Sequence, residues 1–223
     1  MAETVRTIVV RRDVLADVNA DAAAERVRMA KRGTLVVHLV SSPGSGKTTL
    51  LEATARRFAG RRRIAVLVGD IETDRDARRL GPLAPTVQLT TGGACHLEFP
   101  LVRRGIDALG DGPLEYLFIE NVGNLVCPAS HDLGEHLRVV LISVTEGDDK
   151  PGKYPKMFRT SRLMLVSKCD LLPHVPFSMD RVAEDARRIQ PDLDLIAVAA
   201  LDGTGMESWC DYLERERDRL VGD

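Results

Sequence analysis

The sequence lacks the features that direct a chain into a membrane, out of the cell or onto a polyanion. No apolar stretch approaches the roughly 18 residues of a membrane span. Residues 1–6 contain no apolar core of a signal peptide. The formal net charge is only −2 over 223 residues, so no strong basic field favours nucleic acid. We therefore expect a cytoplasmic protein that binds neither membranes nor nucleic acid.

Cysteine is scarce as well. The four cysteines, at positions 95, 127, 169 and 210, do not have the density of a disulfide scaffold. In a reducing compartment they are free thiols or metal ligands. The sequence also has no internal repeat and no low-complexity block, and its 223 residues suit one α/β domain of about 200 residues with a substantial core.

Short apolar, β-rich runs alternate with helical patterns along most of the chain. The expected strands are 35–40, 63–69, 86–91, 115–121, 137–145, 162–167 and 193–199. The expected helices are 46–58, 74–80, 97–109, 178–190 and 204–220. This alternation predicts an α/β fold with a mostly parallel sheet of about seven strands and helices on both faces. Ligands of such sheets bind beyond the carboxyl ends of the strands.

The N-terminal segment does not follow this alternation. Residues 1–12 are interpreted as an extended arm. Residues 14–32 are alanine-rich and charged, which predicts a helix that ends at Gly33. We therefore divide the chain into an N-terminal arm and helix, residues 1–33, and a main domain, residues 34–223.

The most informative motif is Ser-Ser-Pro-Gly-Ser-Gly-Lys-Thr at 41–48, between an expected strand and an expected helix. Such a turn directs backbone N–H groups and a helix dipole at a phosphate. Lys47 would reach the β- and γ-phosphates, and the Thr48 hydroxyl would join the magnesium shell. The usual pattern opens with glycine, and Ser41 stands there instead. The expected nucleotide contacts in this phosphate loop are Gly44, Ser45, Gly46, Lys47, Thr48 and Thr49.

Two acidic residues lie at strand ends near this loop. Asp70 follows the strand at 63–69, and Glu120 ends the strand at 115–121. With Thr48 they are the expected magnesium ligands, because carboxylates hold the ion or its waters against phosphates. Gly123 stands where a mobile γ-phosphate sensor would lie. Acidic strand ends are also common in ordinary loops, so this interpretation depends on the phosphate loop beside them.

A base-recognition motif follows the strand at 162–167. Guanine-binding proteins carry Asn-Lys-x-Asp at this place, and this chain has Ser-Lys-Cys-Asp at 167–170. Asp170 would accept hydrogen bonds from the guanine N1–H and amine, and the Lys168 stem would pack along the purine. Ser167 replaces the asparagine, and Ala199 stands where serine is common. Both changes remove polar groups that would support base recognition. We therefore expect guanine still to be preferred over adenine through Asp170, but less strongly.

Cys95, His96 and Cys127 form a second unusual constellation. Thiolates with an imidazole suit zinc, nickel or copper rather than magnesium or calcium. On the residues alone, a metal site and simple burial of free cysteines remain alternatives. Three ligands leave a coordination position open, which suits transfer or sharing between two subunits. Cys169 and Cys210 are assigned to structure.

Taken together, these motifs resemble those of the HypB family, the GTPases that help deliver nickel to [NiFe]-hydrogenase. The resemblance covers nearly all of residues 34–215. The run Phe-Ile-Glu-Asn-Val-Gly-Asn-Leu-Val-Cys-Pro at 118–128 is the most distinctive part. The other segments that carry it are 41–49, 69–76, 91–97 and 145–155.

The resemblance implies a P-loop G domain of the SIMIBI type over residues 34–223, with GTP or GDP and Mg²⁺ as ligands. It implies that Cys95, His96 and Cys127 form an embedded site for Ni²⁺ or Zn²⁺. It also implies a GTP-dependent homodimer with the metal near its interface, a HypA-type nickel chaperone as partner, and the hydrogenase large subunit as an indirect one. No cysteine precedes 95 and no histidine precedes 38, so the N-terminal nickel store of many members is not expected.

The expected reaction is GTP hydrolysis by water, driven by positioning and charge stabilisation. Lys47 would neutralise phosphoryl oxygens, and Asp70 would orient the water. No residue of the sequence can be identified as an arginine finger, so we expect slow intrinsic turnover of GTP. Lys150 and Lys153 lie in a Pro/Gly-interrupted loop before a helix, where they contact nucleotide or a partner subunit, or form a solvated basic loop.

Because Glu120 and Gly123 share a loop with Cys127, contacts with the γ-phosphate could shift a metal ligand directly. Three other functions remain open on the sequence. The chain could be a related urease-type nickel GTPase accessory protein, although that family's Cys-Pro-His motif differs from the adjoining Cys95 and His96. It could also be an ATP-using P-loop enzyme with structural cysteines, or an interaction module with a vestigial nucleotide site.

Overall fold

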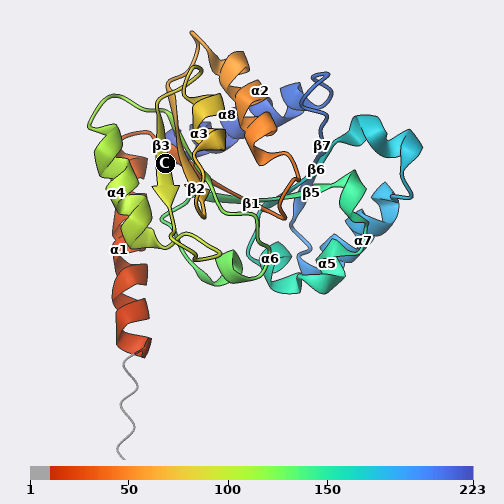
Figure 1. The fold of residues 1–223 in the computed structure, drawn as a ribbon, viewed down its shortest axis with the longest axis horizontal. Coiled ribbons are helices and arrows are strands. Elements are labelled where there is room, and N and C mark those ends of the chain that lie inside the picture. The colour runs from red at the N-terminus through yellow and green to blue at the C-terminus, as the bar shows by residue number, and fades with distance from the viewer. Residues whose placement is uncertain (1–10, 223) are drawn as a thin grey trace, which may run out of the picture.

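The computed structural model describes residues 11–222. These residues fold around a seven-stranded sheet with the order β3-β2-β4-β1-β5-β6-β7 (Figure 1). Every neighbouring pair of these strands is parallel, so all seven carboxyl ends lie along one edge. The strands are β1 (Leu35–Ser41), β2 (Ile64–Asp70), β3 (Thr86–Thr90), β4 (Tyr116–Glu120), β5 (Leu137–Ser143), β6 (Leu163–Ser167) and β7 (Asp194–Ala197).

Helices connect the strands and cover both faces of the sheet. They are α1 (Arg11–Lys31), α2 (Lys47–Phe58), α3 (Arg75–Leu80), α4 (Phe99–Leu109), α5 (Lys150–Lys153), α6 (Pro155–Arg159), α7 (Met179–Ile189) and α8 (Met206–Gly222). Three short 3₁₀ turns are η1 (Cys127–Ser130), η2 (Val144–Glu146) and η3 (Cys169–His174). None of the helices described between residues 11 and 222 combines the length and the hydropathy needed to span a bilayer.

Apolar side chains bury the sheet between two helical layers. On one face, α2 and α8 pack through Leu50 and Trp209, and the Trp209 indole donates a 2.9 Å hydrogen bond to the Thr54 hydroxyl. On the other face, α1 and α4 cover β1, β2 and β4, while α6 and α7 cover β5 and β6. Figure 1 shows α2, α3 and α8 together on one side of the sheet. This burial of both faces explains why the strands are apolar along their whole length.

The α/β fold predicted from the sequence is confirmed, with several boundaries corrected. The sheet is fully rather than mostly parallel. The strand expected at 137–145 ends at Ser143, because the next three residues form η2 and the Ser143 hydroxyl accepts from the Thr145 amide. The strand expected at 193–199 ends at Ala197, since Ala199 pairs with Thr204 instead. Lys150 and Lys153 belong to α5 rather than to a loop.

At the N-terminal end of the described residues, residues 11 and 12 belong to α1, so they are helical and not part of an arm. The rest of the arm expected over 1–12, residues 1–10, lies outside the described residues. Gly33 ends the helix with φ +68°, as predicted. Ala22 and Met29 of α1 are buried, Met29 in the cluster that α4 also covers. The division between residues 33 and 34 stays a prediction.

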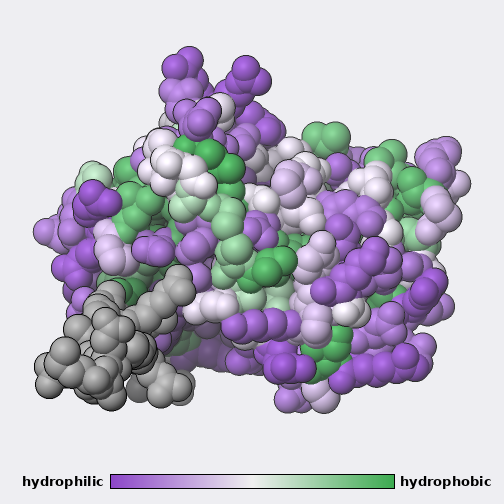
Figure 2. Space-filling model, turned by 60° about the horizontal axis from the view of Figure 1, so that its bottom comes forward, coloured by the Kyte–Doolittle hydropathy of each residue, from purple (hydrophilic) through white to green (hydrophobic). Residues whose placement is uncertain are grey.

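The surface is polar over most of the face drawn in Figure 2, where hydrophobic residues form small separate groups. Among the side chains that the structure describes, the large exposed hydrophobic residues are Val27, Ile71, Val126, Leu201 and Val221. They come from different parts of the chain. Their scatter is ordinary for a protein surface and does not define a docking patch.

A buried polar network joins His38 of β1 to Glu135, which lies just before the start of β5. Glu135 accepts hydrogen bonds from the His38 ring at 3.2 Å and from the Arg138 guanidinium at 2.8 Å. Burial lowers the pKa of His38, which leaves the ring neutral. Burial on its own raises the pKa of Glu135, but His38 and Arg138 reverse this and hold it below its ordinary value. Glu135 is therefore ionised at neutral pH.

This network predicts a specific pH dependence. A carboxyl whose pKa is depressed on folding stabilises the protein above its unfolded pKa, here 4.5, and this stabilisation is lost as the pH falls further. Glu135→Gln leaves a buried guanidinium without its counter-charge, which is expected to cost about 3 kcal/mol at pH 7. Urea unfolding should show this difference from wild type narrowing below pH 4.5. Glu184→Gln, which removes an exposed pair with Arg188, is the control and should cost less than about 1 kcal/mol. A pH-independent difference for Glu135→Gln would contradict the assignment.

Candidate nucleotide and metal site

The phosphate loop opens into a cleft of about 440 Å³ at the carboxyl edge of the sheet. The cleft brings together residues that are far apart in the sequence. Those predicted from sequence that line it are Gly44, Gly46, Lys47, Thr48, Thr49, Asp70, Glu120, Gly123 and Lys168. Ser45 belongs to the loop but does not line the cleft. It is fully buried, and its hydroxyl donates to the Ser42 carbonyl at 2.8 Å. Asp170 is exposed on η3 and does not line the cleft.

Lys47 is held in place by the residue that replaces the usual glycine. Its Nζ donates to the Ser41 hydroxyl oxygen at 2.8 Å, and the Ser41 hydroxyl donates to the Ser42 carbonyl at 2.6 Å. Both side chains are buried. Burial lowers the pKa of Lys47, while Glu120 opposes this. Ser41 therefore orients the lysine from the end of β1.

The residues around Glu120 fit a magnesium ion. Glu120 Oε1 accepts a 2.8 Å hydrogen bond from the Thr48 hydroxyl, while Oε2 is buried without a hydrogen-bond partner. Burial raises the pKa of Glu120 to about 7, against the opposing charge of Lys47. A buried carboxylate oxygen beside a hydroxyl is the hard oxygen donor set that this ion prefers. Glu120 and Thr48 are thus arranged to hold it.

Asp70 ends β2 on the same cleft. Its Oδ1 accepts hydrogen bonds from the backbone amides of Glu72 at 2.9 Å and Thr73 at 2.6 Å. Partial burial by itself raises the pKa of Asp70, but these amides outweigh it and hold the pKa below its ordinary value. Asp70 is consequently ionised and fixed in orientation, as a group that positions water or an ion must be.

The base-recognition segment contacts the phosphate loop directly. Lys168 has left-handed backbone geometry with φ +59°, and its Nζ donates to the Gly44 carbonyl at 2.8 Å. The Ser167 hydroxyl donates to the Ser45 carbonyl at 2.6 Å. The Ser167 hydroxyl therefore joins β6 to the phosphate loop, while a weaker preference for guanine stays a prediction. Ala199 is buried and bonds only through its backbone.

Lys150 and Lys153 differ in their surroundings. Lys150 Nζ lies 3.5 Å from both Ser42 Oγ and a Glu146 carboxylate oxygen, so this lysine contacts the phosphate loop of its own chain. Lys153 is exposed and pairs with Asp149 at 2.6 Å. The structure thus puts Lys150, and not Lys153, beside the loop.

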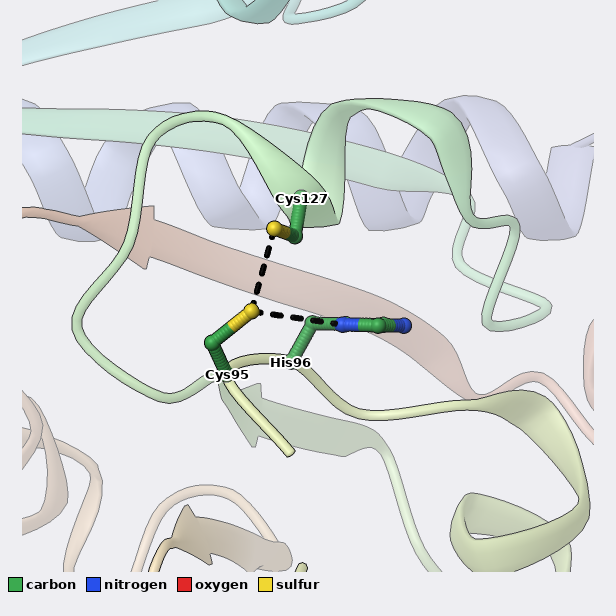
Figure 3. Close-up of side chains that lie close together, drawn as sticks. All are labelled: Cys95, His96 and Cys127. Carbon is green, nitrogen blue, oxygen red and sulfur yellow. Dashed lines mark hydrogen bonds between the residues drawn. The ribbon is translucent and has the colours of Figure 1, made fainter. Parts of the chain in front are cut away.

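Cys95, His96 and Cys127 lie together, as the resemblance to the HypB family implied (Figure 3). The Cys95 and Cys127 sulfurs are 3.0 Å apart, and His96 Nδ1 is 3.8 Å from Cys95 Sγ. Because the Cys95 thiol donates to Cys127, the pKa of Cys95 is raised. Burial and then His131 lower the pKa of His96, which favours the neutral ring that ligates metals. Metal binding would release the shared thiol proton.

The strand order explains why these three residues meet. Cys95 and His96 follow β3, and Cys127 follows β4, while β2 lies between these two strands. The two loops therefore converge over the end of β2. There Gly69 makes room for Leu97, since a Cβ at Gly69 would lie 2.8 Å from the leucine side chain. Glycine at position 69 allows the loop that carries Cys95 and His96 to pack this closely beside Asp70.

Asn121 links the nucleotide cleft to the metal site. Its Oδ1 accepts from the Leu97 amide at 3.1 Å and from the Val122 amide at 2.8 Å. Its Nδ2 donates to His38 Nε2 at 2.8 Å. Asn121 directly follows Glu120, and Leu97 directly follows His96, so one amide side chain connects the predicted magnesium ligand to the predicted nickel ligand.

Three residues at the site were not singled out from the sequence. Asp76 and Arg79 of α3 line the cleft, and Arg79 donates to the Thr49 hydroxyl at 3.2 Å. His131 lies beside His96, with ring centroids 4.0 Å apart. The spacing of four residues between Cys127 and His131, one helical turn, is the signal that could have indicated His131.

The fold and this cleft define a P-loop NTPase whose nucleotide edge also carries a thiolate–imidazole cluster. A family model for the CobW/HypB/UreG nucleotide-binding domain matches residues 35–197. The hydrogenase maturation factor HypB of Azotobacter vinelandii is 46% identical over 213 residues, covering 95% of this chain and 70% of that protein. The chain belongs to the HypB family of hydrogenase maturation factors.

Solved structures of that family share the fold. HypB from Helicobacter pylori, crystallised in complex with nickel, superposes with a TM-score of 0.86 at 38% identity, over 92% of this chain and 97% of that one. HypB from Archaeoglobus fulgidus superposes with a TM-score of 0.84 at 34% identity, over 91% of this chain and all of that one. The predicted P-loop G-domain fold and the resemblance to this family are confirmed.

Proposed function

We propose that this protein is a GTP-hydrolysing nickel metallochaperone that supports nickel insertion into [NiFe]-hydrogenase. Membership of the HypB family supports the maturation role, and the nickel complex of the Helicobacter pylori protein supports the choice of metal. We propose Cys95, His96 and Cys127 as the nickel ligands. Zinc suits the same ligands and competes for them.

The observation that carries the proposal is the side chain of Asn121. Its Oδ1 accepts a hydrogen bond from the backbone amide of Leu97, the residue after His96. Asn121 itself is the residue after Glu120. A nucleotide-dependent movement at the end of β4 would therefore reach the metal ligands through one hydrogen bond. Such a link is what a GTPase needs if its nucleotide is to control metal release.

The proposed hydrolysis uses groups on the cleft wall. Lys47 places its ammonium against the phosphoryl oxygens, and Asp70 orients the attacking water. Thr48, Glu120 and Asp70 would hold a magnesium ion, which would neutralise charge on the phosphates. Guanine selection is assigned to Asp170 and Lys168, and competition between GTP and ATP tests that assignment. Arg79 is a further cation on the cleft wall.

The assembly is proposed on the same basis. Cys95 is exposed at the rim, and three protein ligands leave a coordination position for a second subunit or a partner. We therefore propose a GTP-dependent homodimer that meets at the metal, works in the cytoplasm with a HypA-type nickel chaperone, and acts on the hydrogenase large subunit indirectly.

The test is nickel titration of wild type and Cys95→Ala in the GDP and GTP states. In wild type, nickel affinity should differ between the two states by roughly 5–150-fold, the usual range of coupling between sites. Cys95→Ala should lose at least the 10–100-fold in affinity that even outer-shell changes cost. Cys210→Ala, half-buried on α8, is the matched control and should bind nickel as wild type does. Equal nickel affinity in both nucleotide states would refute the proposal.

A further inference from the structure

His131 lies beside His96 and also contacts the backbone of Cys127. It directly follows η1, four residues after Cys127. Its ring centroid lies 4.0 Å from that of His96, and the planes are tilted by 32°. On the other side, His96 Nδ1 faces Cys95 Sγ at 3.8 Å. The His96 ring thus has both a thiol and a second imidazole as neighbours.

The hydrogen bonding of His131 fixes the nitrogen that is free to ligate. His131 Nδ1 lies 2.9 Å from the Cys127 carbonyl oxygen. A carbonyl oxygen only accepts, so Nδ1 carries the hydrogen. In the neutral ring, Nε2 then keeps its lone pair. Metal-bound histidines commonly have this arrangement, with the other nitrogen donating to a backbone carbonyl.

His96 and Glu98 provide two further donors at the same place. His96 Nε2 is buried without a hydrogen-bond partner. It lies 3.6 Å from the exposed Glu98 carboxylate, which is too far for a hydrogen bond. One donor atom each from His96, Glu98 and His131 lie within 4.8 Å of one another. The two ring planes are tilted by only 32°, so the rings must rotate before the lone pairs of His96 and His131 converge on one ion.

We propose that His96, Glu98 and His131 form a second position for a divalent transition-metal ion, which shares His96 with the thiolate position. This inference rests on the proposed nickel-binding function. Nitrogen and carboxylate oxygen ligands are harder donors than thiolates, so the second position binds soft ions less tightly and releases them sooner. The ion would occupy this position on its way from the two thiolates to an external acceptor.

The transfer is a ligand exchange without any change in oxidation state. The bonds from the ion to the sulfurs of Cys95 and Cys127 break, and bonds to the Glu98 oxygen and His131 nitrogen form. The freed thiolates take protons from solvent. His96 binds the ion through Nδ1 at the first position and through Nε2 at the second, so its Nδ1–metal bond breaks and an Nε2–metal bond forms. The Nε2 proton leaves to solvent, and Nδ1 takes a proton from solvent.

The test begins with the full-length Cys95→Ser/Cys127→Ser protein, stripped of metal and titrated with Ni²⁺ against a chromophoric chelator. We expect one Ni²⁺ to bind, more weakly than to wild type. Adding His131→Phe should weaken this residual binding by about tenfold or more. Adding Glu98→Gln should weaken it too, and this exposed substitution leaves the fold intact. His174→Phe, at an exposed histidine outside both clusters, is the control and should change nothing.

A second experiment keeps both cysteines and measures the rate of Ni²⁺ transfer to the chelator. In otherwise wild-type protein, His131→Phe should leave the equilibrium affinity for Ni²⁺ nearly unchanged but slow Ni²⁺ transfer to the chelator. Residual binding that is absent, or indifferent to both His131→Phe and Glu98→Gln, would overturn the second position. That result would leave the proposed function intact, because the latter depends on Cys95 and on the nucleotide state.

Discussion

Replacing Lys47 with alanine is expected to lower the rate of GTP hydrolysis by on the order of 10²–10³-fold. The lysine is buried, and Ser41 directs its ammonium from beneath the phosphate loop. A preorganised charge in a site that excludes water contributes this much when it faces the charge that develops during reaction. The measurement is phosphate release at saturating GTP and Mg²⁺.

The control for this prediction is Lys31→Ala, at the exposed C-terminal end of α1. It removes the same charge from the chain and should leave turnover unchanged. Lys47→Arg is also informative, because guanidinium keeps the charge but not the shape of the ammonium. A Lys47→Ala protein with turnover within twofold of wild type would show that the cleft is not the hydrolytic site.

The second large effect is expected for Gly123→Ala. A Cβ at Gly123 would lie 2.8 Å from the Cα and the nitrogen of Pro43, and these are backbone atoms that cannot rotate away. The phosphate loop must therefore shift. Overpacking of this kind costs about 1–3 kcal/mol, which corresponds to roughly 5–150-fold in nucleotide affinity if the strain opposes binding.

Nucleotide affinity can be followed by titration with a fluorescent GTP or GDP analogue, and stability by thermal melting. Gly112→Ala is the matched control, because a Cβ added at Gly112 would meet no atom within 4 Å and the φ of this glycine is not positive. Gly123→Ala should lose affinity while melting within a few degrees of wild type. Unchanged affinity for both nucleotides would mean that Pro43 can move freely and that this contact does not position the loop.

Most of the fold could be predicted because each strand is buried on both faces and reads as one apolar run. The seven strands lie within one or two residues of their expected positions, and the phosphate loop lies where its motif required. The short helices α5 and α6 and the turns η1 and η3 were missed. They are too brief to show periodicity, and Pro151 and Pro155, in the first turns of α5 and α6, look like loop residues in sequence.

The site was harder to predict where it depends on strand order. Nothing local in the sequence says that β2 lies between β3 and β4, and this placement brings Cys127 to within 3.0 Å of Cys95. The chemistry of those residues left a shared metal site and simple burial open, and the resemblance to the HypB family implied the shared site. Arg79 was missed because α3 reads as an ordinary charged helix, and only the tertiary structure turns it toward Thr49. Asp170 lies exposed on η3 and does not line the cleft, and its role in guanine recognition stays a prediction.

The hydrogen bonds of Asn121 imply that the two loops move cooperatively. Both of its polar atoms are engaged, its side chain is buried, and its partners come from three segments of the chain. Rotating the amide breaks all of these bonds at once, and each would be left unsatisfied in a water-poor interior. Small displacements are therefore resisted and a large one is all-or-none. The nucleotide and metal loops should thus exchange between two discrete arrangements and not drift through intermediate ones.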